Sequence, residues 1–488
     1  MKKLFLFYLL LFIGIPLWSQ NQPILTLEEA VALTLENNFD IRIAKNDLKI
    51  DEENLTIGNA GMLPRINGTV TNNNTILNQT QTQASGNEIE IDGARNININ
   101  YGVGIEWTIF DGFRMFARHN QLKELQNLGA TELKLSVLSR VSAVYQTYFT
   151  LATQQQQIKM IDSIISVSEF RLKTAKNRFT IGKASKLEVL NAEVDLNADQ
   201  STKIQLQEQY GVSKVMLNEL LVRPLDTDFK VADVISIDNS LLLPDLLSSA
   251  EKQNPQLQLQ YINKKIQEYE LKQVKSNRYP TVSISGGYNL IRSQSPFGFV
   301  TESTGRNFNY GFTASLNLFD GFNQNRNEKV SKIQLENTQL QIERQTQQIQ
   351  SQVASLYQSY LSNLSLLELE KKNESIAKQN MEITLEKFKI GSVAPIEFRT
   401  AQENYANAII RLTSAEFNCK QSEISLKEIV TVSMVLFAVI DIVGSIPIIV
   451  NLRAKVGHIE SEKASLVAGA IMIVFLFVGE GLLNLIGI

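Results

Sequence analysis

The sequence predicts a mixed α/β membrane protein in which a unit of two strands and a long helical hairpin occurs twice. The tetrapeptide Phe-Asp-Gly-Phe ends a strand-like run at 110–113 and again at 319–322, an offset of 209 positions (320 − 111 for the aspartates). Strict alternation of apolar and polar residues precedes both copies, and a long polar segment follows each. The same junction between a strand and a helix is therefore made twice.

Other short sequences recur in the same order at nearly the same offset. RFTIG at 178–182 returns as KFKIG at 387–391, and YQTY at 145–148 returns as YQSY at 357–360. Ordered matches at a nearly constant offset indicate a duplicated unit. The chain then divides into a signal peptide at 1–19, a first repeat at 20–225, a second repeat at 226–428 and a tail at 429–488.

The N-terminus is predicted to direct the protein out of the cytoplasm. Lys2 and Lys3 precede the apolar run LFLFYLLLFIGIPLW, and Ser19 offers a small residue for cleavage, although an uncleaved anchor helix is the alternative. The net charge of −3 gives no indication of nucleic-acid binding. One cysteine and two histidines leave little material for a metal or acid–base site, so we expect neither a cofactor nor an enzyme.

Each half offers two strands that suit a membrane-spanning barrel. Every odd-numbered residue between 97 and 109 is apolar, and the second half repeats the alternation on even numbers between 308 and 318. Weaker alternation begins near Ile66 and near Val282. Barrel strands cross a bilayer in about 9–11 residues, although a soluble sandwich is the alternative reading. Four strands cannot close around a polar lumen, so we expect several subunits to share the barrel.

The segments after the two junctions predict very long helices. Residues 322–390 contain no glycine or proline, and residues 113–181 contain only Gly129. Each segment is long enough for a helix of about 100 Å. Their thin apolar stripes require side-by-side packing, so each helix is expected to form a hairpin with the helix that follows Gly182 or Gly391.

The two junctions themselves are expected to be structural. Asp111 and Asp320 can cap the N-terminus of the helix that follows, because a short acidic side chain accepts hydrogen bonds from free backbone N–H groups. Gly112 and Gly321 permit a sharp turn off the strand. We favour this role over any chemistry at the motif.

With these features, residues 21–428 resemble the TolC-like family of outer-membrane efflux proteins. The resemblance rests on the duplicated plan, on the two Phe-Asp-Gly-Phe junctions, and on the turns RFTIGKASKLEVLNAEVDL and KFKIGSVAPIEFRTAQENY. It implies a homotrimer whose 12-strand outer-membrane barrel, four strands from each of three chains, contacts membrane lipid and continues as an α-helical tunnel through the periplasm of a Gram-negative bacterium. It also implies a periplasmic adaptor (membrane fusion) protein and an inner-membrane pump or type I exporter as partners, with the chain as a passive conduit for drugs or other exported substrates.

The resemblance further implies where the channel narrows and where partners dock. In TolC-like channels, acidic residues six and nine positions after the second tip glycine can ring the periplasmic mouth, which selects Glu397 and Thr400. The matching positions after Gly182 in the first half are Glu188 and Asn191. Converging glutamates would repel anions, although a solvated helix residue is the alternative, and the threonine implies a weaker ring. The residues implied at the docking tips are Arg178, Phe179, Gly182, Lys387, Phe388 and Gly391.

The C-terminal tail departs from this plan. Residues 428–451 and 464–488 are mostly apolar over about 20 positions each and predict two transmembrane helices. The stretch resembles the beginning of the MarC family of inner-membrane proteins, including the segment DIVGSIPI. Because only two spans follow, we favour a truncated or artefactual fusion, and these spans would suit the inner membrane.

Two other functions remain open. A trimeric structural or adhesive surface protein would combine long coiled coils with a barrel anchor, but it predicts one helical block instead of two hairpins with glycine tips. An inner-membrane transporter would follow if the C-terminal spans determine the function. Fractionation of cells that express residues 1–428 or the full chain distinguishes these alternatives.

Overall fold

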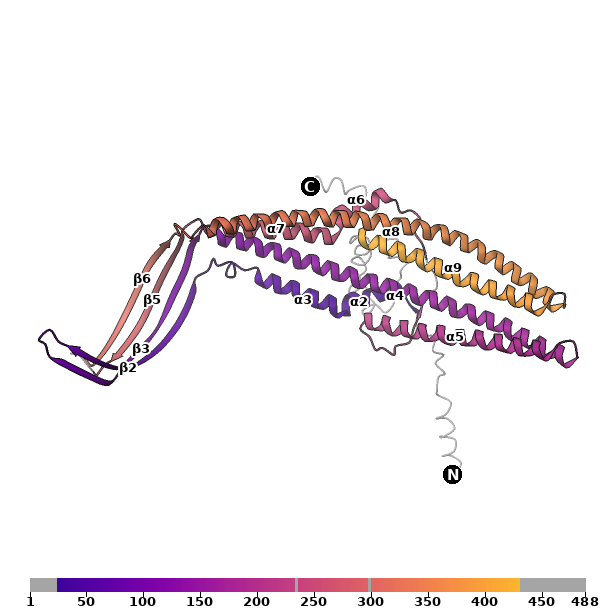
Figure 1. The fold of residues 1–488 in the computed structure, drawn as a ribbon, viewed down its shortest axis with the longest axis horizontal. Helices are drawn as coiled ribbons and strands as arrows, with labels where there is room; N and C mark the ends of the chain where they lie inside the picture. The colour runs from indigo at the N-terminus through magenta and orange to yellow at the C-terminus, as the bar shows by residue number, and fades with distance from the viewer. Residues whose placement is uncertain (1–23, 233–235, 297–299, 431–488) are drawn as a thin grey trace, which may run out of the picture.

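The computed structural model describes residues 24–232, 236–296 and 300–430. The predicted signal peptide and the predicted tail beyond Val430 lie outside the described residues. The molecule is long and bent, with a curved sheet at one end and the tips of two helical hairpins at the other (Figure 1). This arrangement separates a sheet region from a helical region along one axis.

The order of elements repeats in the two halves, as predicted. In each half, two short helices lead into two strands, which are followed by a very long helix and a returning helix. The helices are α2 (Leu27–Asn37), α3 (Phe39–Asn54), α4 (Arg114–Thr180), α5 (Lys186–Leu220), α6 (Leu243–Gln253), α7 (Pro255–Ser276), α8 (Asn323–Lys389) and α9 (Pro395–Val430). The strands are β1 (Ile24–Leu25), β2 (Arg65–Thr82), β3 (Glu88–Asp111), β4 (Lys230–Val231), β5 (Thr281–Gln294) and β6 (Glu302–Ser315).

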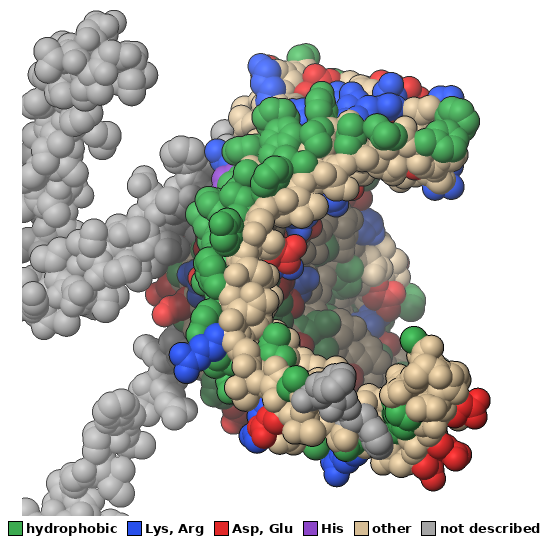
Figure 2. Space-filling view, turned by 90° about the vertical axis from the view of Figure 1, so that its left-hand side faces the viewer, with side chains coloured by type: hydrophobic (Ala, Val, Ile, Leu, Met, Phe, Trp, Pro, Cys, Tyr) green, Lys and Arg blue, Asp and Glu red, His purple; other side chains and the backbone are tan. Residues whose placement is uncertain are grey.

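The four long strands form one antiparallel sheet in the order β2-β3-β5-β6, so the hairpins of the two halves join edge to edge. The register places Val103 opposite Tyr288, and Tyr288 opposite Phe308. Apolar residues of neighbouring strands therefore share one face, as the alternation predicts. Seen from the sheet end, hydrophobic side chains gather along the outer, convex side of the curved sheet (Figure 2).

One strand is shorter than the sequence pattern predicts. The alternation of apolar residues runs to Leu318, but β6 ends at Ser315. Ser315 pairs with Thr281, the first residue of β5, and Pro280 before it has no N–H to extend the ladder. Leu316 and Leu318 therefore follow the sheet as exposed residues at the approach to α8.

The long helices are confirmed with bounds close to the prediction. α4 and α8 contain 67 residues each, which corresponds to about 100 Å of helix. α4 packs along α5 and α8 packs along α9, so each half forms one hairpin. Contacts between α4 and α9 join the two hairpins. Side by side, the four helices extend away from the sheet (Figure 1).

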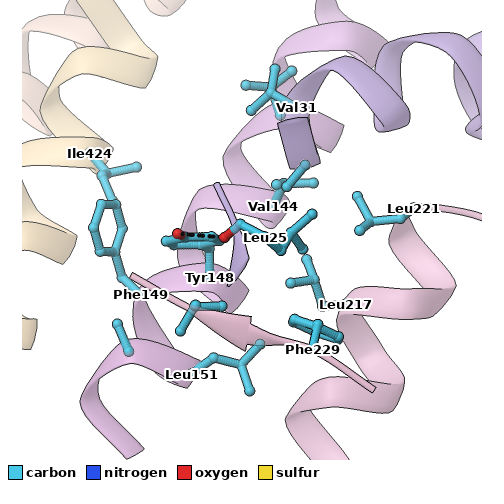
Figure 3. Close-up of a cluster of buried hydrophobic side chains, with 14 residues drawn as sticks. Leu25, Val31, Val144, Tyr148, Phe149, Leu151, Leu217, Leu221, Phe229 and Ile424 are labelled. Atoms are coloured by element: carbon cyan, nitrogen blue, oxygen red, sulfur yellow. Dashed lines mark hydrogen bonds between the residues drawn. The ribbon is translucent and has the colours of Figure 1, made fainter. Parts of the chain in front are cut away.

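The repeated motifs YQTY and YQSY have a common structural cause. The hydroxyl of Tyr148 donates to the carbonyl oxygen of Leu25 at 3.0 Å and accepts from the amide of Ala232 at 3.1 Å. Figure 3 shows this ring inside a cluster of buried side chains from α2, α4, α5 and the small β1/β4 pair. Tyr360, the counterpart in the second half, donates to the carbonyl of Asp238. Each tyrosine hydroxyl therefore holds the backbone of a distant segment against the long helix that carries the tyrosine, α4 or α8.

The last described helix runs through the predicted boundary between the second repeat and the tail. α9 continues to Val430, Leu426 is fully buried, and the side chain of Asn254 donates to the carbonyl of Ile429 at 3.0 Å. The division after residue 428 lies inside the last described helix and stays a prediction. Within the described ranges, no helix is both long enough and apolar enough to span a bilayer.

Candidate functional site

The junction aspartates lie where the capping role requires them. The carboxylate of Asp111 accepts from the amide of Met115 at 3.0 and 3.2 Å, and that of Asp320 accepts from the amide of Gln324 at 2.7 Å. These bonds satisfy free N–H groups in the first turns of α4 and α8. These hydrogen bonds are what a structural role of both aspartates requires.

The glycines of the junctions have the left-handed backbone that the motif predicts. φ is +68° at Gly112 and +69° at Gly321. The phenylalanine after each glycine, Phe113 or Phe322, is also left-handed, with φ of 68° and 65°. Two consecutive residues of this kind turn the chain sharply, so each helix begins one residue later than the sequence indicates.

At the opposite end, the two hairpins close with the same turn. φ is +75° at Gly182 and +77° at Gly391, and the residue after each glycine donates its amide to the carbonyl five positions earlier, at 2.7 and 2.9 Å. This bond pattern is the helix C-cap that favours glycine. No atom lies within 4 Å of a Cβ built at either glycine, so both turns face open space.

The aromatic residues predicted at the two tips lie in different environments. Phe179 is 44% exposed, whereas Phe388 is only 2% exposed and stacks on Phe398 with 4.9 Å between ring centroids. The ring of Phe388 therefore supports the second turn from inside, and it offers no surface to a partner. This corrects the expectation that the side chain of Phe388 contributes to a docking surface.

Two of the residues predicted at the channel mouth share a groove along the second hairpin. Glu397 and Thr400 line a groove of about 370 Å³ between α8 and α9, together with Lys387 and Ile396. Glu397 is exposed in the first turn of α9, and in the described part of the chain it takes part in no ion pair. No cation of the described chain therefore offsets its charge.

The two residues predicted in the first half line a neighbouring groove. Glu188 and Asn191 face a cleft of about 460 Å³ between the two hairpins, which Thr400 and Ile396 also line. Glu188 lies 3.6 Å from Arg178 (Oε1 to Nη1), so a cation of its own hairpin offsets its charge. The structure therefore brings the four residues to two adjoining grooves and makes the two glutamates unequal.

Sequence reasoning missed Ile396, which lines both grooves and is 70% exposed. It follows Pro395 and precedes Thr400 by four residues, so it lies one helical turn away on the same face of α9. In the sequence, Ile396 is only an apolar residue between Pro395 and Glu397. The sequence alone does not show that the face of α9 with Ile396 and Thr400 lines the two grooves.

A buried ionic cluster joins the two hairpins behind these grooves. Arg171 of α4 pairs with Asp195 of α5, and Arg399 of α9 reaches both Asp195 at 3.8 Å and Asp199 at 3.3 Å. Burial, and then the like charge of Arg399, lower the pKa of Arg171 to about 10. The guanidinium therefore remains charged at neutral pH and depends on its carboxylate partners.

Hydrogen bonds extend the cluster to a second layer. The hydroxyl of Ser168 donates to Asp199 at 2.6 Å, and the amide of Gln402 donates to that hydroxyl at 2.7 Å and to the carbonyl of Ile164 at 3.2 Å. Residues from α4, α5 and α9 are thus linked in one polar network. This network, which the sequence does not reveal, fixes α9 and its exposed first turns against the first hairpin.

The sheet, the two hairpins and their glycine tips define a class of protein: an outer-membrane channel continued by a helical tunnel. The family model described as "outer membrane efflux protein" matches residues 30–222 and 246–431, which is more than half of the chain. The chain therefore belongs to the outer membrane efflux protein family. A model of the MarC family of integral membrane proteins matches residues 426–488.

Solved structures support the same fold. The CmeC outer membrane channel of Campylobacter jejuni aligns with a TM-score of 0.69 at 15% identity, covering 85% of this chain and 89% of that one. VceC of Vibrio cholerae aligns at 0.67 and 14%, covering 83% and 95%. The MtrE channel of Neisseria gonorrhoeae, in its open state, aligns at 0.65 and 14%, covering 83% and 88%. No curated protein sequence matches the chain.

Family membership confirms several expectations from the sequence. The chain is the outer-membrane channel component of an efflux system, and its place is the outer membrane and the periplasm. Members of this family conduct substrates passively, so the chain is not an enzyme. The match that begins at 426 also confirms the resemblance of the tail to the MarC family.

Proposed function

We propose that three copies of the chain form one closed conduit. The sheet of one chain ends in two free edges, β2 and β6, and its four strands are too few to enclose a lumen. A ring of three chains would join β6 of one copy to β2 of the next and give twelve strands. Cyclic symmetry satisfies every edge in the same way, and this is the usual route to closed homo-oligomers.

The helices support the same assembly. Ile376 and Ile383 of α8, and Ile390 directly after the helix, are seven residues apart and exposed in the single chain. A repeat of seven places such residues along one seam of a helix that pairs with another helix. We infer that these stripes pack between copies, so that the hairpins of three chains close into a tunnel below the barrel.

The proposed role is a conduit that a periplasmic adaptor protein couples to an inner-membrane pump or type I exporter. The observation that carries it is the duplicated hairpin, because two tips per chain reach far from the sheet and end in glycine turns that face open space. Substrates would enter at these tips and leave through the barrel, across the periplasm and the outer membrane. The tail and its two predicted spans stay a prediction and have no part in this proposal.

At the periplasmic mouth, we infer a constriction formed by the first turns of α9. Glu397 carries the charge, while Ile396 and Thr400 narrow the opening beside it. Glu188 and Asn191 line the adjoining cleft, and Arg178 already offsets the charge of Glu188. Three carboxylates near one axis attract cations and repel anions.

We expect Glu397→Gln to reduce the cation selectivity of single channels in planar bilayers. The substitution keeps the size of the side chain and removes three like charges from the mouth of the trimer. The effect should be largest at low salt, where the Debye length is long, about 30 Å at 0.01 M. The measurement is the reversal potential across a salt gradient, recorded at low and at high ionic strength.

Glu188→Gln is the matched control for this experiment. Its charge is already offset by Arg178, so the reversal potential should move less than in Glu397→Gln. An unchanged reversal potential for Glu397→Gln at low salt would place the constriction elsewhere. An equal shift in both variants would mean that the two glutamates line the mouth equally.

A further inference from the structure

Three strands of the four-stranded sheet carry an arginine where the apolar series of their outer face ends. Two positions beyond the last apolar residue of each series, at the end of the sheet away from the helices, the chain has Arg95 on β3, Arg292 on β5 and Arg306 on β6. We call these three residues the arginine row. Because the same residue type recurs at the same place on three strands, a common cause outside the chain is expected.

The register of the sheet places the arginine row on the apolar face. Directly opposite residues of neighbouring strands share a face. The residues opposite Arg95, Arg292 and Arg306 are Ile76, Ile99 and Leu290, respectively. The three arginines therefore belong to the outer, convex side of the sheet, along which hydrophobic side chains gather (Figure 2).

The length of the apolar series places the arginine row at the edge of a bilayer. The series occupy 97–109 on β3 and 282–290 on β5, and a barrel strand crosses the bilayer in about 9–11 residues. An arginine that faces lipid is costly at the middle of the bilayer and nearly neutral at its edge. Phe308 and Tyr310, which follow Arg306 on the same face, are 67% and 82% exposed and suit the aromatic girdle of that edge. The arginine row therefore lies at the level of the lipid headgroups.

The leaflet follows from the direction of the helices. The tunnel helices of an outer-membrane channel extend into the periplasm, so the far end of the sheet meets the outer leaflet (Figure 1). That leaflet consists largely of a glycolipid whose sugars carry phosphate groups. Arg292 is paired with Glu302 at 2.8 Å, whereas Arg95 and Arg306 are exposed and take part in no ion pair of the described chain. The position of the arginine row thus supplies the anionic neighbour that the chain itself does not.

We propose that the arginine row binds the phosphate groups of the outer-leaflet glycolipid. This inference rests on the proposed barrel, in which the outer face of the sheet meets lipid, and it adds a specific lipid partner. Arg292 and Arg306 are diagonal neighbours on adjacent strands, about 7–8 Å apart. Both guanidinium groups can therefore reach one phosphate group, and each can donate two parallel hydrogen bonds to it. The acyl chains of the lipid lie along the apolar face beside the row.

The test uses the intact channel in a non-ionic detergent and three lipid probes. The probes are lipid A, which is the phosphorylated anchor of the glycolipid, phosphatidylglycerol, and a neutral galactosyl diacylglycerol. Native mass spectrometry, with a chelator present so that no divalent cation bridges the partners, measures how much of each lipid the channel retains. Lipid A should bind at least about tenfold more tightly than either other probe.

Two outcomes with these probes overturn the proposal. Equal binding of lipid A and the neutral glycolipid would mean that the apolar face alone retains the lipid. Equal binding of lipid A and phosphatidylglycerol would mean that any anionic headgroup satisfies the arginines, so that the glycolipid has no special place.

Variants of the arginine row should change the affinity for lipid A in both directions. Arg306→Gln should lower it about tenfold, and Arg292→Gln/Arg306→Gln should remove the preference for lipid A. Glu302→Gln should raise the affinity, because it frees Arg292 and removes a negative charge beside the phosphate group. Arg65→Gln is the matched control, since Arg65 is an exposed strand arginine that precedes the outward-facing Ile66 and so lies on the inner face. An equal loss in Arg65→Gln would contradict the proposed site.

The mass of the channel keeps this inference separate from the proposed function. If the wild-type particle has the mass of three chains but retains the three lipids alike, only the lipid site is wrong. A wild-type particle with the mass of one chain would instead contradict the barrel and the lipid site with it. If Arg292→Gln/Arg306→Gln lowers the mass, Arg306→Gln alone decides the question, because it breaks no ion pair of the described chain.

Discussion

Gly112→Ala should prevent stable folding of the junction, whereas Gly321→Ala, the same change in the second half, should be tolerated. Both glycines are left-handed, which costs a residue with a Cβ about 1–2 kcal/mol. A Cβ at Gly112 would lie 2.4 Å from the carbonyl oxygen of Ser276 and 2.8 Å from the Cβ of Tyr279. At Gly321 the nearest atom is the side-chain nitrogen of Asn323, at 3.7 Å.

The steric conflict at Gly112 is with backbone, which cannot move without displacing the end of α7. Overpacking of this kind costs about 1–3 kcal/mol beyond the strain in φ. Thermal unfolding of the purified channel, followed by circular dichroism, should show a much larger loss of Tm for Gly112→Ala than for Gly321→Ala. Equal losses would mean that the close approach of α7 to the first junction does not persist in the assembled protein.

The second large effect is expected for Arg171→Met. Arg171 is 4% exposed and its guanidinium pairs with Asp195, which also lies 3.8 Å from Arg399. Methionine fills a similar volume, but it leaves the partly buried carboxylate of Asp195 with Arg399 alone as its cationic partner. Breaking a buried ion pair in this way costs about 3–5 kcal/mol. The ion pair between Lys203 and Asp162, at 2.7 Å on the surface, is the control.

Lys203→Met should cost no more than about 1 kcal/mol, because exposed ion pairs contribute little. The free energy of unfolding in urea measures both variants, and the tunnel helices dominate the circular dichroism signal. A double variant, Arg171→Met with Asp195→Leu, should recover part of the loss since no charge is left alone. A small effect of Arg171→Met would show that water reaches the cluster and that it does not fix α9 against the first hairpin.

Much of the fold follows from local patterns in the sequence. Alternation between 97 and 109 predicts a long strand with one apolar face, and β3 runs through this segment. The absence of glycine and proline after Phe322 predicts the length of α8 to within a residue or two. Asp111 and Asp320 cap their helices, because the reach of a carboxylate to nearby N–H groups depends only on local geometry.

The remaining features depend on contacts between distant segments. Arg171 and Arg399 both pair with Asp195 although they are 228 positions apart (399 − 171). No periodic pattern in the sequence predicts that two such distant residues share a partner. The burial of Phe388 follows from its stacking on Phe398 across the turn, whereas its counterpart Phe179 stays exposed.

The candidate mouth was predicted in part. The resemblance selects Glu397 and Glu188 as equivalents, because both lie six residues after a glycine. The structure makes them unequal, since Arg178 lies near Glu188 and the described chain gives Glu397 no ion pair. The position of Ile396 at the mouth could not be predicted from the sequence. Only the grooves on both sides of α9 show which face of its first turn is open.

We propose that one chain supplies a third of a closed channel, because its sheet has two free edges and its long helices carry exposed apolar residues. Multi-angle light scattering of residues 20–430, purified in detergent and corrected for bound detergent, tests it most directly. The protein mass should equal that of three chains and should not fall on dilution. A stable, folded particle with the mass of one chain would contradict the shared barrel and, with it, the conduit.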